Sequence, residues 1–190
     1  MKKQIILSSF LTIALSLSQL AFSDQNEDLL NSTIKGDFSA VKKSLGNGAN
    51  PNYRVRTGNF KKWSALMLAS DRGHLEIVKL LINSRANVNA RLISGSFAGM
   101  TALIASANKG HVEIARLLLN AGADVNAMFT SSEYSGWTSL IIASSKGLTE
   151  MVKLLINSRA NVNTKVTGDR YSGYSALHFA TVYKYNEIIK

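Results

Sequence analysis

The stretch VKLLINSRANVN occupies residues 78–89 and recurs letter for letter at residues 152–163, 74 positions later. A variant, ARLLLNAGADVN, lies halfway between the two copies, at residues 115–126. Glycine, leucine and alanine also recur at the half spacing of 37 residues, at Gly36, Gly73, Gly110 and Gly147, at Leu66, Leu103, Leu140 and Leu177, and at Ala49, Ala86, Ala123 and Ala160. We therefore expect about five units, at roughly 26–62, 63–99, 100–136, 137–173 and 174–190, of which the first and last are imperfect.

Each unit predicts two short helices followed by an extended segment. Residues 64–70 read as a compact helix of small residues, and Gly73 follows where the end of a helix needs a positive φ. Residues 74–82 then carry the broad apolar face of a second helix. The segment Ala86–Asn89 is rich in turn residues and is expected to bury one valine, Val88. Because one unit cannot bury both of its helices, the units must stack into an all-α repeat solenoid.

These anchors resemble the ankyrin-repeat family. Three segments of the third unit carry its motifs: Met100–Leu103 at the start of the first helix, Gly110–Ile114 at the start of the second, and Leu117–Asn126 beyond it. The resemblance covers nearly all of residues 26–190. It implies a domain over 24–190 built of helix-turn-helix units with hairpin fingers, which binds a partner protein in a groove lined by the fingers and the first helices.

The sequence departs from the family pattern at the start of the first helix and, in two units, at the end of the second helix. The family's proline before the first helix is replaced by Ala65, Ala102, Ser139 or Ala176, and its histidine is kept only as His178. At the end of the second helix, Arg85 and Arg159 replace a glycine, which costs on the order of 1 kcal/mol for a left-handed residue. The units are also longer than the family's, and the excess falls in the finger.

The first residues have the layout of a secretory signal peptide. Lys2 and Lys3 precede an apolar run over residues 5–22, and small residues at Ala21 and Ser23 predict cleavage after Ser23. A retained membrane anchor is the alternative, since this run is just long enough to span a bilayer. No later stretch is apolar for long enough to span a bilayer. We therefore expect an exported bacterial protein, periplasmic or secreted, with a signal peptide at 1–23.

Composition narrows the classes of function. The chain has no cysteine, which excludes disulfides, thiolate catalysis and a lipidated N-terminus. Its net charge is +10, or about +8 without the two lysines of the leader, which favours acidic partners. An acidic protein face is the preferred partner, and envelope glycan or lipid head groups are the alternative. We expect no nucleic acid partner, and a monomer.

No catalytic or cofactor motif is evident. His74 and His111 hold the same place in successive units and would lie about 10 Å apart, too far to share a metal ion. No serine lies in a Gly-x-Ser-x-Gly elbow, no glycine-rich phosphate loop is present, and Asp71 has no carboxylate at its register in the neighbouring units. We expect a protein that is not an enzyme, with no metal and no cofactor.

Three columns of residues recur at the 37-residue step and are the candidates for partner binding. The finger-base column, just before the first helix, holds bulky side chains that the family register places on the surface, where they are anchors or pack on the neighbouring finger: Trp63, Met100, Trp137 and Tyr174. The basic column, which closes the first helix, is either part of the groove or a solvated edge: Arg72, Lys109, Lys146 and Tyr183. The finger column is expected to stack along the row and stiffen the fingers, with ligand contact as a compatible role: Phe60, Phe97, Tyr134 and Tyr171.

The repeat register also bears on the last residues of the chain. By register, residues 186–190 form only the opening turn of a second helix, which would leave the apolar face of the last unit uncovered. Either the chain is a fragment, or a partner covers that end.

Overall fold

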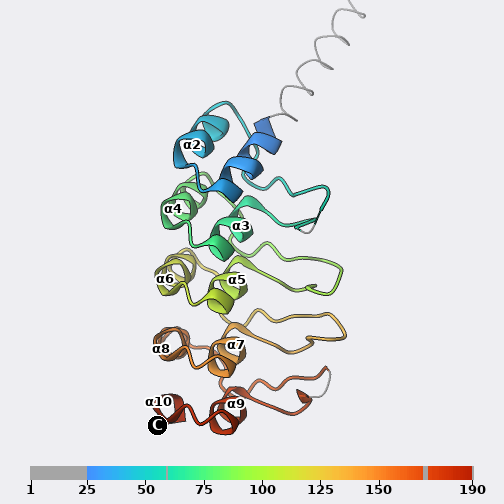
Figure 1. Cartoon of the computed structure of the whole chain (residues 1–190), viewed down its shortest axis with the longest axis vertical. Coiled ribbons are helices and arrows are strands. Elements are labelled where there is room, and N and C mark those ends of the chain that lie inside the picture. Colours follow the sequence, from blue (N-terminus) through green and yellow to red (C-terminus); the bar gives the residue numbers. More distant parts are fainter. Residues whose placement is uncertain (1–24, 59, 169–170, 190) are drawn as a thin grey trace, which may run out of the picture.

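The computed structural model is a stack of helix pairs, from which long fingers project to one side (Figure 1). It describes residues 25–58, 60–168 and 171–189, so the predicted signal peptide lies outside the described residues. A helix over residues 25–35 comes first. It is followed by α2 (Phe38–Gly46), α3 (Ala65–Arg72), α4 (Leu75–Asn83), α5 (Ala102–Lys109), α6 (Val112–Asn120), α7 (Ser139–Ser145), α8 (Thr149–Asn157), α9 (Ala176–Val182) and α10 (Asn186–Ile189). Within these ranges no helix is long and apolar enough to cross a bilayer.

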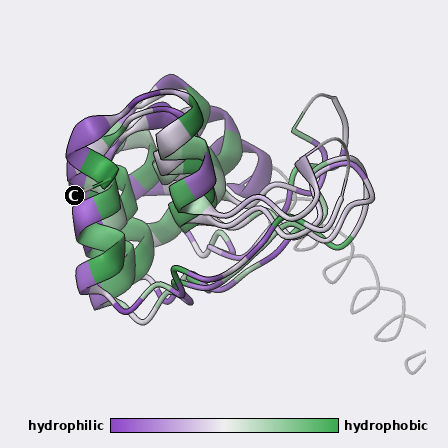
Figure 2. Cartoon of the chain, turned by 90° about the horizontal axis from the view of Figure 1, so that it is seen from below, coloured by the Kyte–Doolittle hydropathy of each residue, from purple (hydrophilic) through white to green (hydrophobic). Residues whose placement is uncertain are grey.

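The helices form two rows. The inner helices α3, α5, α7 and α9 contact one another in order, and the outer helices α2, α4, α6, α8 and α10 do the same behind them. Seen along the stack, the helices superpose in one block and the fingers extend away from it along similar paths (Figure 2). The predicted all-α repeat solenoid is confirmed.

The inner helices α3, α5 and α7 are buried on nearly every side because neighbouring units and the outer row cover them. In α5, for example, residues 102–107 are all buried. Each of α3, α5 and α7 begins at a serine or threonine whose hydroxyl oxygen accepts a hydrogen bond from a backbone amide of the first turn. In α5, Thr101 accepts from the amide of Ile104 at 3.2 Å. α3 and α5 end at Gly73 and Gly110 in the left-handed region (φ 78° and 75°), which confirms the predicted glycine stop.

The outer helices bury one face only. In α6, Ile114, Ala115 and Leu118 are buried while Glu113 and Arg116 are exposed. Leu118, in the central unit, has an exposed fraction of 0%. After α4 and α8, Arg85 and Arg159 adopt φ of 63° and 65°, so both non-glycine residues are indeed left-handed.

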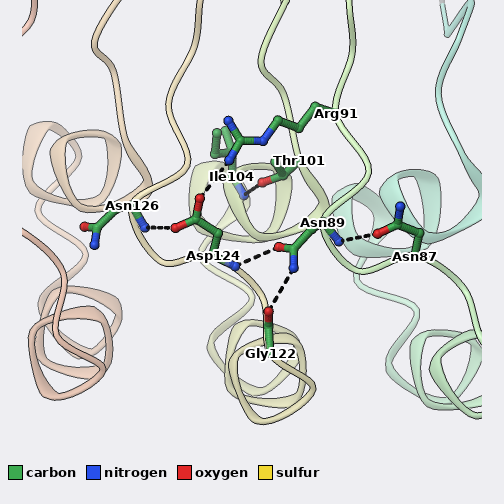
Figure 3. Close-up of polar contacts among 8 residues, drawn as sticks. All are labelled: Asn87, Asn89, Arg91, Thr101, Ile104, Gly122, Asp124 and Asn126. Atoms are coloured by element: carbon green, nitrogen blue, oxygen red, sulfur yellow. Dashed lines mark hydrogen bonds and ion pairs between the residues drawn. The ribbon is translucent and has the colours of Figure 1, made fainter.

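The extended segments that follow the outer helices are joined by side-chain amides (Figure 3). Asn89 accepts a hydrogen bond from the amide of Asp124 at 2.8 Å and donates to the carbonyl of Gly122 at 2.9 Å. Arg91 adds an ion pair to Asp124 at 2.7 Å. The expected full burial of Val88 is wrong: the side chain packs against the core but is only half-buried, in a segment whose backbone is also held by these polar bonds.

Each finger is closed at its base by a reciprocal pair of backbone hydrogen bonds in the same register. In the finger of the third unit, the amide of Phe129 donates to the carbonyl of Trp137 at 2.9 Å, and the amide of Gly136 donates to the carbonyl of Phe129 at 3.1 Å. Neighbouring fingers are also joined directly, by the amide of Thr130 donating to Ala98 at 2.8 Å. The fingers therefore form a continuous wall beside the inner helices. We call the surface lined by this wall and by the C-terminal ends of the inner helices the concave face.

Candidate binding cleft on the concave face

The finger-base column is less exposed than the sequence predicted. Trp63 and Met100 have exposed fractions of only 7% and 5%, so the expected surface register is wrong for both of them. The physical reason is the closure of each finger, which brings the rest of the finger over its own base; the ring of Phe60, for instance, lies edge-on to Trp63 at 5.2 Å. Trp137 and Tyr174 are half-buried, and a contact with a partner stays a prediction for them.

The finger column stacks at one step of the row. The rings of Phe97 and Tyr134 lie 6.0 Å apart and 15° from parallel, as predicted for stacked fingers. Elsewhere the rings turn toward the helices: Phe60 toward Trp63, and Tyr171 toward Trp137 at 6.0 Å. A row stacked throughout is therefore wrong, because the finger-base aromatic side chains offer nearer partners.

A cleft of about 320 Å³ opens between the third and fourth units. Three aromatic rings form its finger wall. The ring centroid of Phe129 lies 6.4 Å from that of Phe97 and 5.9 Å from that of Tyr134. Its remaining lining comes from the finger bases and the inner helices: Met100, Trp137, Ile142, Asn108, Ser145 and Lys146. Apolar side chains thus dominate, and the polar groups gather at the C-terminal ends of α5 and α7.

The basic column has two electrostatic environments. In the second and third units, Asp71 lies 3.9 Å from both Arg72 and Lys109, and this carboxylate is largely shielded, with a side-chain exposure of 15%. The guanidinium of Arg72 also lies over the ring of Phe60 at 5.4 Å. These two cations therefore share one carboxylate within the protein.

Lys146 differs, because the position equivalent to Asp71 is the neutral Asn108. Its ammonium donates to the backbone carbonyl of Asn108 at 2.7 Å and to the side-chain oxygen at 2.6 Å. Burial first, and then the nearby charge of Lys109, lower the pKa of Lys146 below its ordinary value. Within the described residues no carboxylate pairs with this ammonium.

The three histidines pack against, or hydrogen-bond to, the turns and helix ends around them. The rings of His74 and His111 lie against the left-handed glycines of the preceding units, Gly36 and Gly73, so closely that a β-carbon there would fall 2.7 and 2.8 Å from the ring. His111 Nε2 is also 3.2 Å from the carbonyl oxygen of Asp71. His178 Nδ1 is 2.8 Å from the hydroxyl of Ser175, which closes the start of α9. Among the described residues, no group of three histidine, aspartate or glutamate side chains could hold a metal ion.

The cleft unites five of the predicted site residues and adds others that sequence reasoning missed. The predicted ones are Phe97, Met100, Tyr134, Trp137 and Lys146, whereas Arg72, Lys109, Phe60, Trp63, Tyr171 and Tyr174 lie in other units or other parts of the surface. The missed residues are Asn108, Phe129, Ile142 and Ser145. Each of their positions recurs at the same 37-residue step. Comparing Asp71 with Asn108, or Leu92 with Phe129, could therefore have shown that these positions differ between successive units.

Comparison with known families gives one match. The family model described as "Ankyrin repeats (3 copies)" matches residues 29–129 and 128–190. No curated protein matched the chain.

Proposed function

Since the chain belongs to the ankyrin-repeat family, whose repeats are generally protein–protein interaction modules and typically non-catalytic, we propose that it is a binding scaffold that holds a partner protein on its concave face. The cleft between the third and fourth units carries this proposal. It combines a mainly aromatic and aliphatic lining with one cation that lacks a carboxylate partner within the described residues. Large aromatic side chains and a few polar groups are the usual composition of binding hot spots.

The mechanism we propose is binding to a preformed surface. The finger wall is tied together by backbone hydrogen bonds between neighbouring fingers, and the inner helices below it are buried on both sides. A surface that is already ordered loses little conformational entropy when a partner binds.

We also propose that binding takes place outside the cytoplasm, after removal of the signal peptide at Ser23. The support is the order of charged, apolar and small residues over 1–23. Mass spectrometry of the protein from its natural host tests this directly. A mature chain that begins at Asp24 is the expected result, and a chain that still begins at Met1 would contradict export by this route.

The proposed function is tested by comparing partner capture on two faces of the molecule. Purified protein is immobilised and exposed to envelope extract, as wild type, as the concave-face variant Lys146→Glu, and as the outer-helix variant Lys153→Glu. Lys153 is exposed on α8 and pairs with Glu150 at 3.0 Å, so it is a matched lysine away from the concave face. We expect Lys146→Glu to lose the captured partner and Lys153→Glu to retain it, with both folded by circular dichroism; equal capture by the two variants would contradict a concave binding face.

A second candidate is the binding of acidic glycan or lipid head groups, favoured by the net charge, which is +10 for the whole chain and about +8 without Lys2 and Lys3. The salt dependence of capture separates it from a protein partner. Binding of a polyanion should collapse as salt rises because it rests on the release of counterions. A contact centred on the aromatic cleft should be much less sensitive.

A further inference from the structure

The polar end of the cleft distinguishes it from the equivalent surface one unit earlier. At the junction of the second and third units, Asp71 compensates Lys109, the residue that corresponds to Lys146. At the junction of the third and fourth units, Asn108 replaces that aspartate. The exchange keeps an oxygen that binds Lys146, at 2.6 Å, but removes the negative charge.

Lys146 retains a donor for a ligand. An ammonium group has three N–H donors. Two of them bind oxygens of Asn108, and within the described part of the chain the third has no partner. Burial and the nearby charge of Lys109 both disfavour the ammonium form of Lys146, so an incoming carboxylate would stabilise it.

The volume of the apolar part of the cleft limits the size of the ligand group that can bind beside Lys146. Its volume of about 320 Å³ is at the small end of ligand cavities, so it accepts a large side chain with its immediate neighbours rather than a folded surface. Phe97, at the finger wall, is 48% exposed although its ring stacks on Tyr134. Such a wall favours an aromatic or long aliphatic side chain.

We propose that this cleft binds an extended segment of the partner in which an aromatic or large aliphatic residue lies next to an acidic residue, with the apolar side chain in the aromatic cleft and the carboxylate on Lys146. This deepens the proposed function by naming the recognised chemistry. The carboxylate belongs to an internal aspartate or glutamate. A free C-terminal carboxylate is usually captured by a nest of backbone amides, and the cleft's charged donor is a side chain.

The experiment selects the ligand without knowledge of the partner. A random twelve-residue peptide library displayed on phage is selected on the purified protein. Recovered peptides are then synthesised with acetylated and amidated ends, and their affinities are measured by fluorescence polarisation. We expect the recovered peptides to share an apolar anchor within two positions of an acidic residue.

Variants of the protein then locate the carboxylate. Asn108→Asp places at this junction the charge that Asp71 supplies one unit earlier, and should weaken binding about ten-fold or more, as should Lys146→Gln. Lys146→Arg should bind within a few-fold of wild type, and Lys109→Gln, which changes a cation already paired with Asp71, should have a small effect. Replacing the peptide's acidic residue by its amide should abolish the difference between Asn108→Asp and wild type. Asn108→Ala controls for loss of the amide, and circular dichroism checks the fold of each variant.

Several results would overturn the inference: recovery of no peptide, acidic peptides without an apolar anchor, or binding that needs a free C-terminus. Peptides whose affinity Asn108→Asp leaves unchanged would also overturn it. These failures differ from failure of the proposed function. A partner captured from extract and lost with Lys146→Glu, but with no such peptide motif, would keep the concave binding face and remove only the assigned chemistry.

Discussion

The junction between the second and third units and the junction between the third and fourth are built on the same register but differ in surface chemistry. At the first, a carboxylate lies between two cations, and Leu92 and Ala105 occupy the positions of the finger wall and the helix floor. At the second, the carboxylate is an amide, and Phe129 and Ile142 take those two positions. Three exchanges therefore distinguish one junction from the next, and two of them, Leu92 to Phe129 and Ala105 to Ile142, lie at positions that are buried in both units.

The two tryptophans give the largest expected difference between these junctions. Trp63 is buried, so Trp63→Ala should destabilise the protein by about 3–5 kcal/mol, the range for large aromatic residues in a core. Trp137→Ala should destabilise it less, since the side chain is half-buried, but should weaken peptide binding by about 2 kcal/mol. Urea denaturation and fluorescence polarisation measure the two effects. A Trp63→Ala variant with full stability would mean that the finger base is not part of the core.

Leu118 belongs to the unit that both junctions share. Leu118→Ala should lower the free energy of unfolding by about 2–5 kcal/mol because the side chain is fully buried in the central outer helix. Leu117→Ala, one position earlier and only half-buried, is the matched control and should cost less. An unchanged urea midpoint for Leu118→Ala would show that the buried face of α6 is assigned wrongly.

The ends of the outer helices also differ between the second and third units. Arg85 ends the second unit's outer helix at φ 63°, where the third unit has Gly122 at φ 86°. Arg85→Gly should therefore stabilise the protein by about 1 kcal/mol by removing left-handed strain. Thermal unfolding followed by circular dichroism should show a small rise in the midpoint, whereas Gly122→Arg should lower it.

The charge exchange should have the smallest effect on stability. Asp71→Asn should destabilise the protein by less than about 1 kcal/mol, because it removes a carboxylate from two partly exposed cations at 3.9 Å. Asn108→Asp should stabilise it by a similarly small amount. Both differences should shrink as salt is added, since screening weakens partly exposed pairs. A difference that persists in high salt would mean that hydrogen bonding, rather than charge, separates the two junctions.

The repeat explains how much of this fold was predictable. The spacing of glycine, leucine and alanine predicted the helix pairs, their stacking and the buried position of Leu118, because these patterns report which face of a short helix is apolar. The left-handed Arg85 and Arg159 were predictable for the same reason, since a helix stop is a local feature of the chain. The binding role of the predicted surface columns stays a prediction.

Other features depended on contacts between segments. The sequence register could not show that a finger folds over its own base and buries Trp63 and Met100, since that burial comes from the path of the finger and not from the helix pattern. Nor could it show that Val88 is only half-buried, since its exposure depends on how closely neighbouring units cover it.

The sequence by itself determined the period, the helix pairs, the core register and the columns from which a binding surface is made, because these follow from residue spacing along one unit. The tertiary structure decided which members of those columns meet in one cleft and which cation lacks a carboxylate partner within the described residues. Those properties depend on side chains from successive units, whose distances are set only when the units stack. Lys109 and Lys146 are both lysines at the end of an inner helix, and only the neighbouring unit makes one compensated and the other available to a ligand.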